Sequence, residues 1–205
     1  MKYCSDPDFS NLLSVLNREA PSRPTLFEFF MNGPLYVKLA GRAEEPAWGS
    51  ADADKMLIDA FRNAGYDYVT YMPAWMMFPK SEVDHKASRS MNDTAIIFDR
   101  ASYEAYTWPD PDACDYSRLD SLAALLPEGM KVVSHGPGGV LENVMQITGY
   151  EGLCMMMMDD PELVKRIFDD VRSRLVRFSE ISSPHTVVGA VISNDDWGFS
   201  NQTML

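Results

Sequence analysis

Two adjacent acids, Asp195 and Asp196, follow an apolar segment in the stretch VVGAVISNDDWGFSNQTML (187–205). Two carboxylates that lie close together raise the pKa of one of them, which suits proton transfer, and a carboxylate can stabilise positive charge in a transition state. We therefore take them as the candidate catalytic residues. Adjacent residues of a strand point to opposite faces, so a regular strand would turn only one toward a common interior. A helix cap or a solvated loop is the alternative interpretation of the pair.

Polar or aromatic residues also close the other apolar segments of the chain. Ligands of parallel α/β proteins bind at the carboxyl ends of the strands, so these positions are the candidate contacts to a substrate. The candidate substrate-binding residues are Tyr71, Met72, His135, Gly136, Asn143, Asn194 and Trp197. His85 and His185 fall in expected loops and are weaker candidates.

The Gly-Pro-Gly-Gly stretch at 136–139 invites comparison with phosphate-binding loops, but it lacks the spacing of the P-loop and of the dinucleotide fingerprint. A tight turn that leads into a helix explains it more simply. The N-terminus of that helix would offer N–H groups and a positive dipole end to a carboxylate or phosphate. Glu142 and Asn143 lie in its first turn, where a helix-stabilising role and a substrate contact are equally consistent with the sequence.

The elements that must position these residues alternate between strands and helices. Apolar, β-branched runs predict strands over 25–30, 66–73, 131–136 and 186–193, and helical periodicity predicts helices over 6–19, 50–64, 115–126, 137–148 and 159–182. Residues 92–107 are expected to form a β-hairpin or edge strands. The helix over 50–64 has its apolar stripe at Met56, Leu57, Ala60, Phe61 and Ala64, with Ser50 or Asp52 as cap and Gly65 as its end. This alternation predicts an α/β fold with a parallel sheet.

Composition narrows the classes of partner. Thirty acids against 18 Lys and Arg give a net charge of −12, which repels phosphate backbones and argues against nucleic acid. Cys4, Cys114 and Cys154 are widely spaced, so neither a disulfide framework nor a Cys-x-x-Cys site is expected. The N-terminus lacks the apolar run of a signal peptide, and the run LCMMMM (153–158) is too short for a membrane span. We expect a cytoplasmic protein. The methionine run is expected to lie on a helix and to pack in the protein core.

Several motifs resemble the uroporphyrinogen decarboxylase superfamily, which includes cobamide-dependent methyltransferases. They are the segment HGPGGVLENVMQITGYEGLCMMMMDDPELVKRIFDDVRSRL, the strand end ISNDDWGFSNQTML and the opening LNREAPSRPTLFEFF. The resemblance covers nearly the whole chain and implies a (β/α)8 TIM-barrel fold of roughly 340 residues. Residues 1–205 would then be a uroporphyrinogen decarboxylase-like domain truncated after about the first half of the barrel. A half barrel leaves two sheet edges open, so pairing with another copy is one expectation.

The resemblance also bears on the activity. Decarboxylases of the superfamily carry two arginines in P-x-W-x-M-R-Q-A-G-R, whereas the matching segment at 24–30 has none and carries Glu28. Leu39-Ala40-Gly41-Arg42 echoes the end of that motif but lies too far downstream, and Val144 stands where decarboxylases have a tyrosine. These departures favour methyl transfer between a corrinoid and a thiol over decarboxylation of uroporphyrinogen III to coproporphyrinogen.

Cofactor and partner expectations follow from the same resemblance. The methyltransferase branch binds zinc through ligands that would lie beyond Leu205, so no metal ligand is expected within this chain, while zinc and a corrinoid are possible in the full-length protein. The expected partners are a tetrapyrrole-related or other small-molecule substrate and a corrinoid protein. Whether the chain is an enzyme by itself stays open, since a partial barrel could instead be an inactive binding or assembly subunit.

Overall fold

A computed structural model describes residues 6–81 and 92–203; Cys4 and His85 fall outside these ranges. The chain divides into two compact units. Unit 1 comprises residues 1–73, 116–135 and 182–191, and unit 2 comprises residues 74–115, 136–181 and 192–205.

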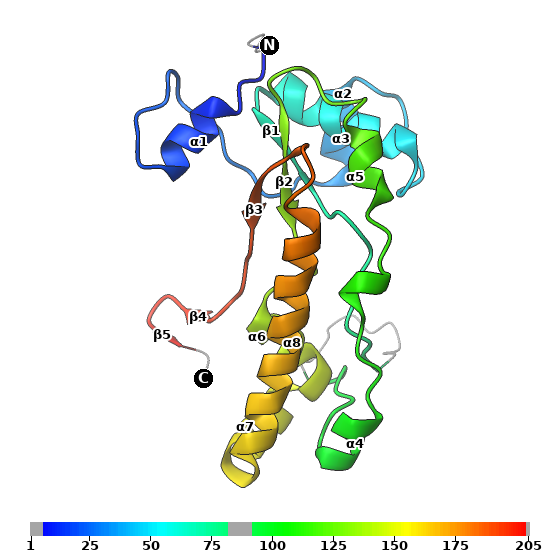
Figure 1. Ribbon diagram of the computed structural model, residues 1–205, viewed down its shortest axis with the longest axis vertical. Helices are drawn as coiled ribbons and strands as arrows, with labels where there is room; N and C mark the ends of the chain where they lie inside the picture. The colour runs from blue at the N-terminus through cyan, green and yellow to red at the C-terminus, as the bar shows by residue number, and fades with distance from the viewer. Residues whose placement is uncertain (1–5, 82–91, 204–205) are drawn as a thin grey trace. The chain divides into compact units, whose positions relative to one another are not determined.

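Unit 1 is built on a three-stranded parallel sheet. Its strands β1 (Tyr68–Tyr71), β2 (Lys131–His135) and β3 (Val188–Ile192) are neighbours in chain order (Figure 1). Tyr68 lies opposite Lys131 and Tyr71 opposite Ser134. The strand interiors are fully buried at Val69 and Val132, as expected of parallel strands covered by helices. In the described residues the sheet does not close into a barrel. The expected α/β class is confirmed, and the barrel itself stays a prediction.

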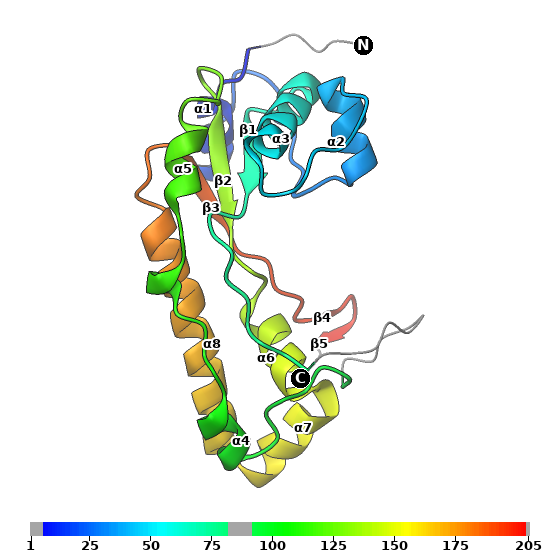
Figure 2. The same cartoon turned by 90° about the vertical axis from the view of Figure 1, so that its right-hand side faces the viewer.

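The helices of unit 1 follow local sequence signals. They are α1 (Ser10–Leu16), α2 (Gly33–Ala40), α3 (Ala51–Ala64) and α5 (Ser117–Leu122). The Ser50 hydroxyl accepts from the N–H of Ala53 at 3.2 Å and caps α3, which ends at Gly65 with φ of 93°. α3 packs against α2 and β1 (Figure 2). Its expected stripe is buried at Met56, Ala60 and Phe61, whereas Leu57 and Ala64 are half-buried and Ala53 and Ile58 are buried instead.

The predicted strand over 25–30 is wrong. The segment pairs with β1 through side chains instead of a backbone ladder: the Tyr68 hydroxyl accepts from Glu28 N–H at 2.7 Å and donates to its carbonyl oxygen at 2.8 Å. The Thr70 hydroxyl donates to the carbonyl oxygen of Phe29. Because hydroxyl groups satisfy these backbone groups, no ladder forms. The apolar residues Leu26, Phe27 and Phe30 are exposed, unlike those of a doubly covered strand.

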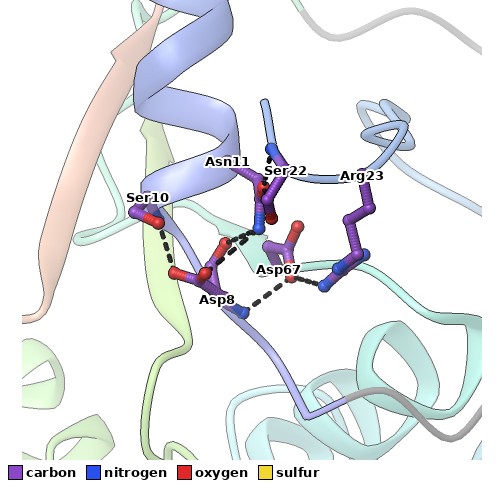
Figure 3. A network of polar contacts seen from close by, with 6 residues as sticks. All are labelled: Asp8, Ser10, Asn11, Ser22, Arg23 and Asp67. Carbon is purple, nitrogen blue, oxygen red and sulfur yellow. Dashed lines mark hydrogen bonds and ion pairs between the residues drawn. The ribbon is translucent and has the colours of Figure 1, made fainter. Parts of the chain in front are cut away.

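A polar network fixes the N-terminal segment of unit 1 (Figure 3). Asp67, just before β1 and only 3% exposed, accepts from the backbone N–H of Asp8 at 2.8 Å and forms an ion pair with Arg23. The Asn11 side chain donates to the Asp8 carboxylate at 3.2 Å and accepts from Ser22 N–H at 2.9 Å. The network lies at the amino end of β1 and ties residues 8–23 to the start of the sheet.

Unit 2 is mostly helical. It contains α4 (Arg100–Ala105), the short 3-10 helix η1 (Pro111–Ala113), α6 (Val140–Thr148), α7 (Tyr150–Asp159) and α8 (Pro161–Ser182). A small antiparallel hairpin, β4 (Gly198–Phe199) with β5 (Gln202–Thr203), follows the acid pair. The helix predicted over 159–182 is confirmed as α8, which begins two residues later at Pro161. No helix in the described ranges is both long and apolar enough to cross a membrane.

The predicted hairpin over 92–107 is also wrong, because α4 occupies part of it. A capping box starts this helix: the Asp99 carboxylate accepts from Ser102 N–H at 2.8 Å, and the Ser102 hydroxyl accepts from Asp99 N–H at 3.0 Å. The sequence signal was Asp followed three residues later by Ser, a capping arrangement that outweighs the β propensity of the preceding Ile-Ile-Phe. α2 was not predicted, and α7 was predicted only as a helix containing the methionine run, without bounds.

Candidate functional site

The first turn of α6 is capped by a residue far along the chain. Asp195, in the loop after β3, accepts from the N–H of Leu141 at 2.8 Å through one carboxylate oxygen and from the N–H of Glu142 at 3.0 Å through the other. These are the donors that an N-cap side chain normally satisfies, but the N-cap residue here is Gly139, which has no side chain. Asp195 therefore supplies both the acceptor and the negative charge that favour this helix end. The contacts of Asp195 are those that the helix-cap interpretation predicts.

Gly139 makes this approach possible. A β-carbon at position 139 would overlap the Asp195 carboxyl group, so only glycine leaves room for it. The Glu142 carboxylate accepts from Gly139 N–H at 3.0 Å, which satisfies a further group at the same helix end. Because Asp195 and Glu142 take these N–H groups, the first turn of α6 does not offer them to an external anion as the sequence suggested.

Asn143 holds the Gly-Pro-Gly-Gly loop in shape. Its side-chain amide donates to the carbonyl oxygens of Pro137 at 3.0 Å and Gly139 at 2.7 Å, and the residue is only 3% exposed. The contacts of this predicted substrate-binding residue are thus to the loop backbone. Glu142, Asn143 and Asp195 thus hold the backbone of this loop and of the first turn of α6 through hydrogen bonds.

The remaining predicted residues of the segment 194–197 face solvent. Asn194 and Asp196 are exposed, and the Trp197 side chain is 54% exposed. The Asp196 carboxylate accepts one long hydrogen bond, 3.4 Å, from Gly198 N–H. The two acids are therefore engaged by different parts of the backbone: Asp195 by α6 and Asp196 by its own loop. Their assignment as catalytic residues stays a prediction.

Three predicted residues, Tyr71, Met72 and His135, belong to unit 1 at the carboxyl ends of β1 and β2. Met72 is half-buried, and the His135 ring meets the Phe29 ring edge-on with centroids 5.1 Å apart. Gly136, the first residue of unit 2 after β2, is half-buried. The outlying His185 faces Asp120, 3.1 Å from its carboxylate.

Tyr71 is part of a buried polar cluster. Its hydroxyl donates to the Asp54 carboxylate at 3.0 Å, and the Arg118 guanidinium binds both oxygens of that carboxylate at 2.6 Å. Arg118 also lies over the Tyr71 ring, 5.8 Å from its centroid. Burial and then the Asp54 charge raise the pKa of Tyr71 well above its usual value, so the hydroxyl stays protonated and acts as a donor.

Asp54 and Arg118 were not singled out from the sequence. The available signal was an acid on the core-facing side of α3, four residues before the buried Ile58 and seven before the buried Phe61. A carboxylate buried to 5% exposure needs a cation nearby, but the sequence does not say which one.

A metal site in a protein needs several ligand side chains close together. Within 6–81 and 92–203, no three His, Cys, Asp or Glu side chains gather as a metal site would require. Cys114 points its thiol at the carbonyl oxygens of Asp110 and Trp75, at 3.4 and 3.7 Å, and burial raises its pKa. The described residues therefore do not fit a zinc ion.

Comparisons with known proteins add no assignment: no family model, no curated protein and no solved structure matches the chain.

Proposed function

We propose that this chain is part of a (β/α)8-barrel enzyme of the uroporphyrinogen decarboxylase superfamily that binds a tetrapyrrole-related ligand and takes part in corrinoid-dependent methyl transfer. The observation that carries the proposal is the order of the sheet: β1, β2 and β3 lie side by side in chain order with helices between them. Successive strands of a (β/α)8 barrel have this order. The choice of superfamily rests on the sequence motifs around 135–175 and 192–205.

The loop after β3 supplies the ligand-contacting groups of the proposal. Asp195 acts as a positioning residue, because its carboxylate is bound to the first turn of α6. The loop it anchors presents Asn194, Asp196 and Trp197 to solvent. The Trp197 indole offers a flat apolar surface on which a macrocycle can stack, and the Asn194 amide and Asp196 carboxylate can hydrogen-bond its peripheral groups. Tyr71, Met72, His135 and Gly136 stay predicted contacts.

The absence of arginine from the segment 24–30 favours methyl transfer over decarboxylation. A decarboxylase must bind a substrate rich in carboxylates, and arginine is the residue suited to that task. The segment 24–30 has no arginine, and the neighbouring Arg23 is already paired with the buried Asp67. A corrinoid carries mainly neutral amide side chains, so it does not need the two arginines of the decarboxylase motif.

The test is a binding titration of the purified protein with methylcobalamin and, separately, with coproporphyrin, followed by tryptophan fluorescence and the visible spectrum of the ligand. We expect saturable corrinoid binding that Trp197→Ala weakens about tenfold, which corresponds to about 1.4 kcal/mol of stacking energy. Trp75→Ala, a change at another exposed tryptophan, should leave the affinity unchanged.

Activity assays then separate the reactions. The protein is incubated with methylcobalamin and a series of small thiols, and separately with uroporphyrinogen. Corrinoid binding with loss of the methyl group supports the proposal, whereas conversion of uroporphyrinogen to coproporphyrinogen would establish decarboxylation instead. Binding of neither macrocycle, together with an oligomer in light scattering, would overturn it in favour of an assembly subunit.

A further inference from the structure

Unit 2 contains an open apolar groove that the proposed function does not use. It has a volume of about 490 Å³, within the range of ligand pockets, and lies beside the start of α4, the face of α7 and the start of α8. Met156 and Leu163 are buried at its base, 6% and 1% exposed. Phe98 and Met155 line it with side chains that are 62% and 63% exposed. Large apolar groups left in water at one place mark a binding surface.

Several methionine side chains of α7 are exposed to solvent. Met157 and Met158, next to the groove residue Met155, are 43% and 83% exposed, so the helix is apolar on its outer side as well as its inner side. Part of the expectation that this run packs in a core is therefore wrong: Met156 is buried, and its three neighbours are not. At the groove itself, the flexible and polarisable side chains of Met155 and Met156 suit a surface that adapts to the side chains of a partner, whereas Met157 and Met158 lie outside its lining.

The groove carries an excess of negative charge. Asp99, Asp159 and Asp160 line it, against the single cation Arg100. Arg100 is held by Asp160 at 2.7 Å, so its charge is already compensated. Asp159 is exposed and has no ion-pair partner in the described part of the chain. An apolar base with an acidic border attracts a cationic amphipathic partner and repels phosphate groups and anionic lipid.

We propose that this groove, lined by Phe98, Met155, Met156, Asp159 and Leu163, is a docking site for an amphipathic helical peptide with apolar residues on one face and Lys or Arg beside them. The apolar side chains of the peptide would enter between Phe98 and Met155, and its cations would meet Asp99 and Asp159. Such helix-in-groove recognition uses apolar anchors spaced three and four residues apart. The inference is independent of the proposed methyl transfer.

Gly152 gives the test a precise tool. It lines the groove from within α7, and a β-carbon built on it would have nothing within 4 Å. A larger side chain there should project into the open groove without disturbing the core. Replacing a helical glycine also favours the helix, so Gly152→Leu should fold at least as stably as the wild type. Met158→Gln is the matched control, because Met158 is more exposed, lies on the same helix and does not line the groove.

The experiment titrates protein labelled with ¹³C at the methionine methyl groups with a Leu/Lys amphipathic peptide of about 15 residues, long enough for a helix to form on binding. We expect saturable shifts of the Met155 and Met156 methyl signals, while Met130, buried in unit 1, stays unchanged. Gly152→Leu should weaken binding by about tenfold or more, and Asp159→Asn should weaken it and reduce its salt dependence. Met158→Gln should change the affinity less than about twofold, as expected outside the contact.

Three results would overturn the proposal. A Leu/Glu peptide of the same spacing that binds equally well would remove the role of the acidic border. Unchanged affinity of Gly152→Leu would show that the peptide lies elsewhere. Concentration-dependent self-association of the free protein that Gly152→Leu abolishes would show that a second copy of the chain occupies the groove.

Discussion

The carboxyl group of Asp195 fills the space that a β-carbon on Gly139 would occupy. The two residues are far apart in sequence, yet the acid serves as the N-cap side chain that Gly139 cannot provide. The helix α6 and the loop after β3 are thereby joined by two charge-assisted hydrogen bonds.

Gly139→Ala should therefore displace Asp195 from the end of α6. We expect a loss of about 1–3 kcal/mol in the free energy of unfolding, because two helix donors lose their acceptor and the side chain must move. Asp195→Ala should cost about 1–2 kcal/mol through the lost cap. Urea unfolding of both single variants and the double variant gives the coupling.

The double variant is the sharper measurement. If Gly139 matters because it admits Asp195, the double variant should be much less destabilised than the sum of the single changes. Asp196→Ala is the control and should fall within about 0.5 kcal/mol of the wild type, since Asp196 is exposed. Additive losses in the double variant would contradict the linkage.

Local signals predicted well those elements whose causes are local. Ser50 and Gly65 delimit α3 by contacts within a few residues, and the sequence placed both ends of that helix. Residues 25–30 looked like a buried strand because their apolar run is a local signal. The contacts that decide their structure come from residues far away in the sequence. Tyr68 and Thr70, some forty residues away, take up the backbone groups that a ladder would have used.

The same distinction holds for the candidate site. The sequence marked Asp195 as important and included a helix cap among its roles, but it could not specify α6, because the partners lie 53 and 54 positions away. Asp54 was missed because its partners Tyr71 and Arg118 are 17 and 64 positions away. Composition and periodicity carry no information on such pairs.

The Asp54–Arg118 ion pair should be costly to break from one side. Asp54 is buried, so Arg118→Met would leave a carboxylate without its cation, and we expect a loss of about 3 kcal/mol, at the low end for buried pairs because Arg118 is partly exposed. Thermal or urea unfolding measures it. Combining Arg118→Met with Asp54→Leu removes both charges and should recover part of the loss, since an apolar pair can replace a buried ion pair. A double variant less stable than Arg118→Met would contradict this account.

The capping box of α4 offers a test in unit 2. Asp99→Ala removes the acceptor for Ser102 N–H and should lower the urea midpoint of unfolding at neutral pH. Asp99→Asn keeps an acceptor oxygen and should retain most of the stability.

The pKa of Asp99 is lowered by its hydrogen bonds to Ser102, so the folded state favours the ionised cap. This contribution is present above the ordinary pKa of aspartate and is lost as the pH falls through the lowered pKa. Equal stability of Asp99→Ala and wild type at neutral pH would contradict the cap.

Alkaline titration should reveal the burial of Tyr68. Burial raises its pKa from the ordinary value of 10.0 to about 12, while its hydrogen bond with Glu28 acts in the opposite direction. Because the folded state holds the proton more tightly, this contribution to stability is complete below about pH 10 and is lost as the pH rises toward about 12. The wild type should therefore lose stability across this interval as measured by urea unfolding, and its phenolate absorbance should develop late.

Tyr68→Phe separates this residue from the other tyrosines. It removes both contacts to Glu28 and should cost about 1–2 kcal/mol at neutral pH, where the phenol is protonated. Above pH 10 its stability should fall less steeply than that of the wild type, because one tyrosine with a raised pKa is gone; Tyr71 and Tyr106, whose pKa values burial also raises, keep the slope from vanishing. The stability of Tyr68→Phe could instead fall as steeply as that of the wild type between pH 10 and 12. This result would show that Tyr68 ionises at its ordinary pKa in the folded protein, and it would contradict the interpretation that its hydroxyl is buried against Glu28.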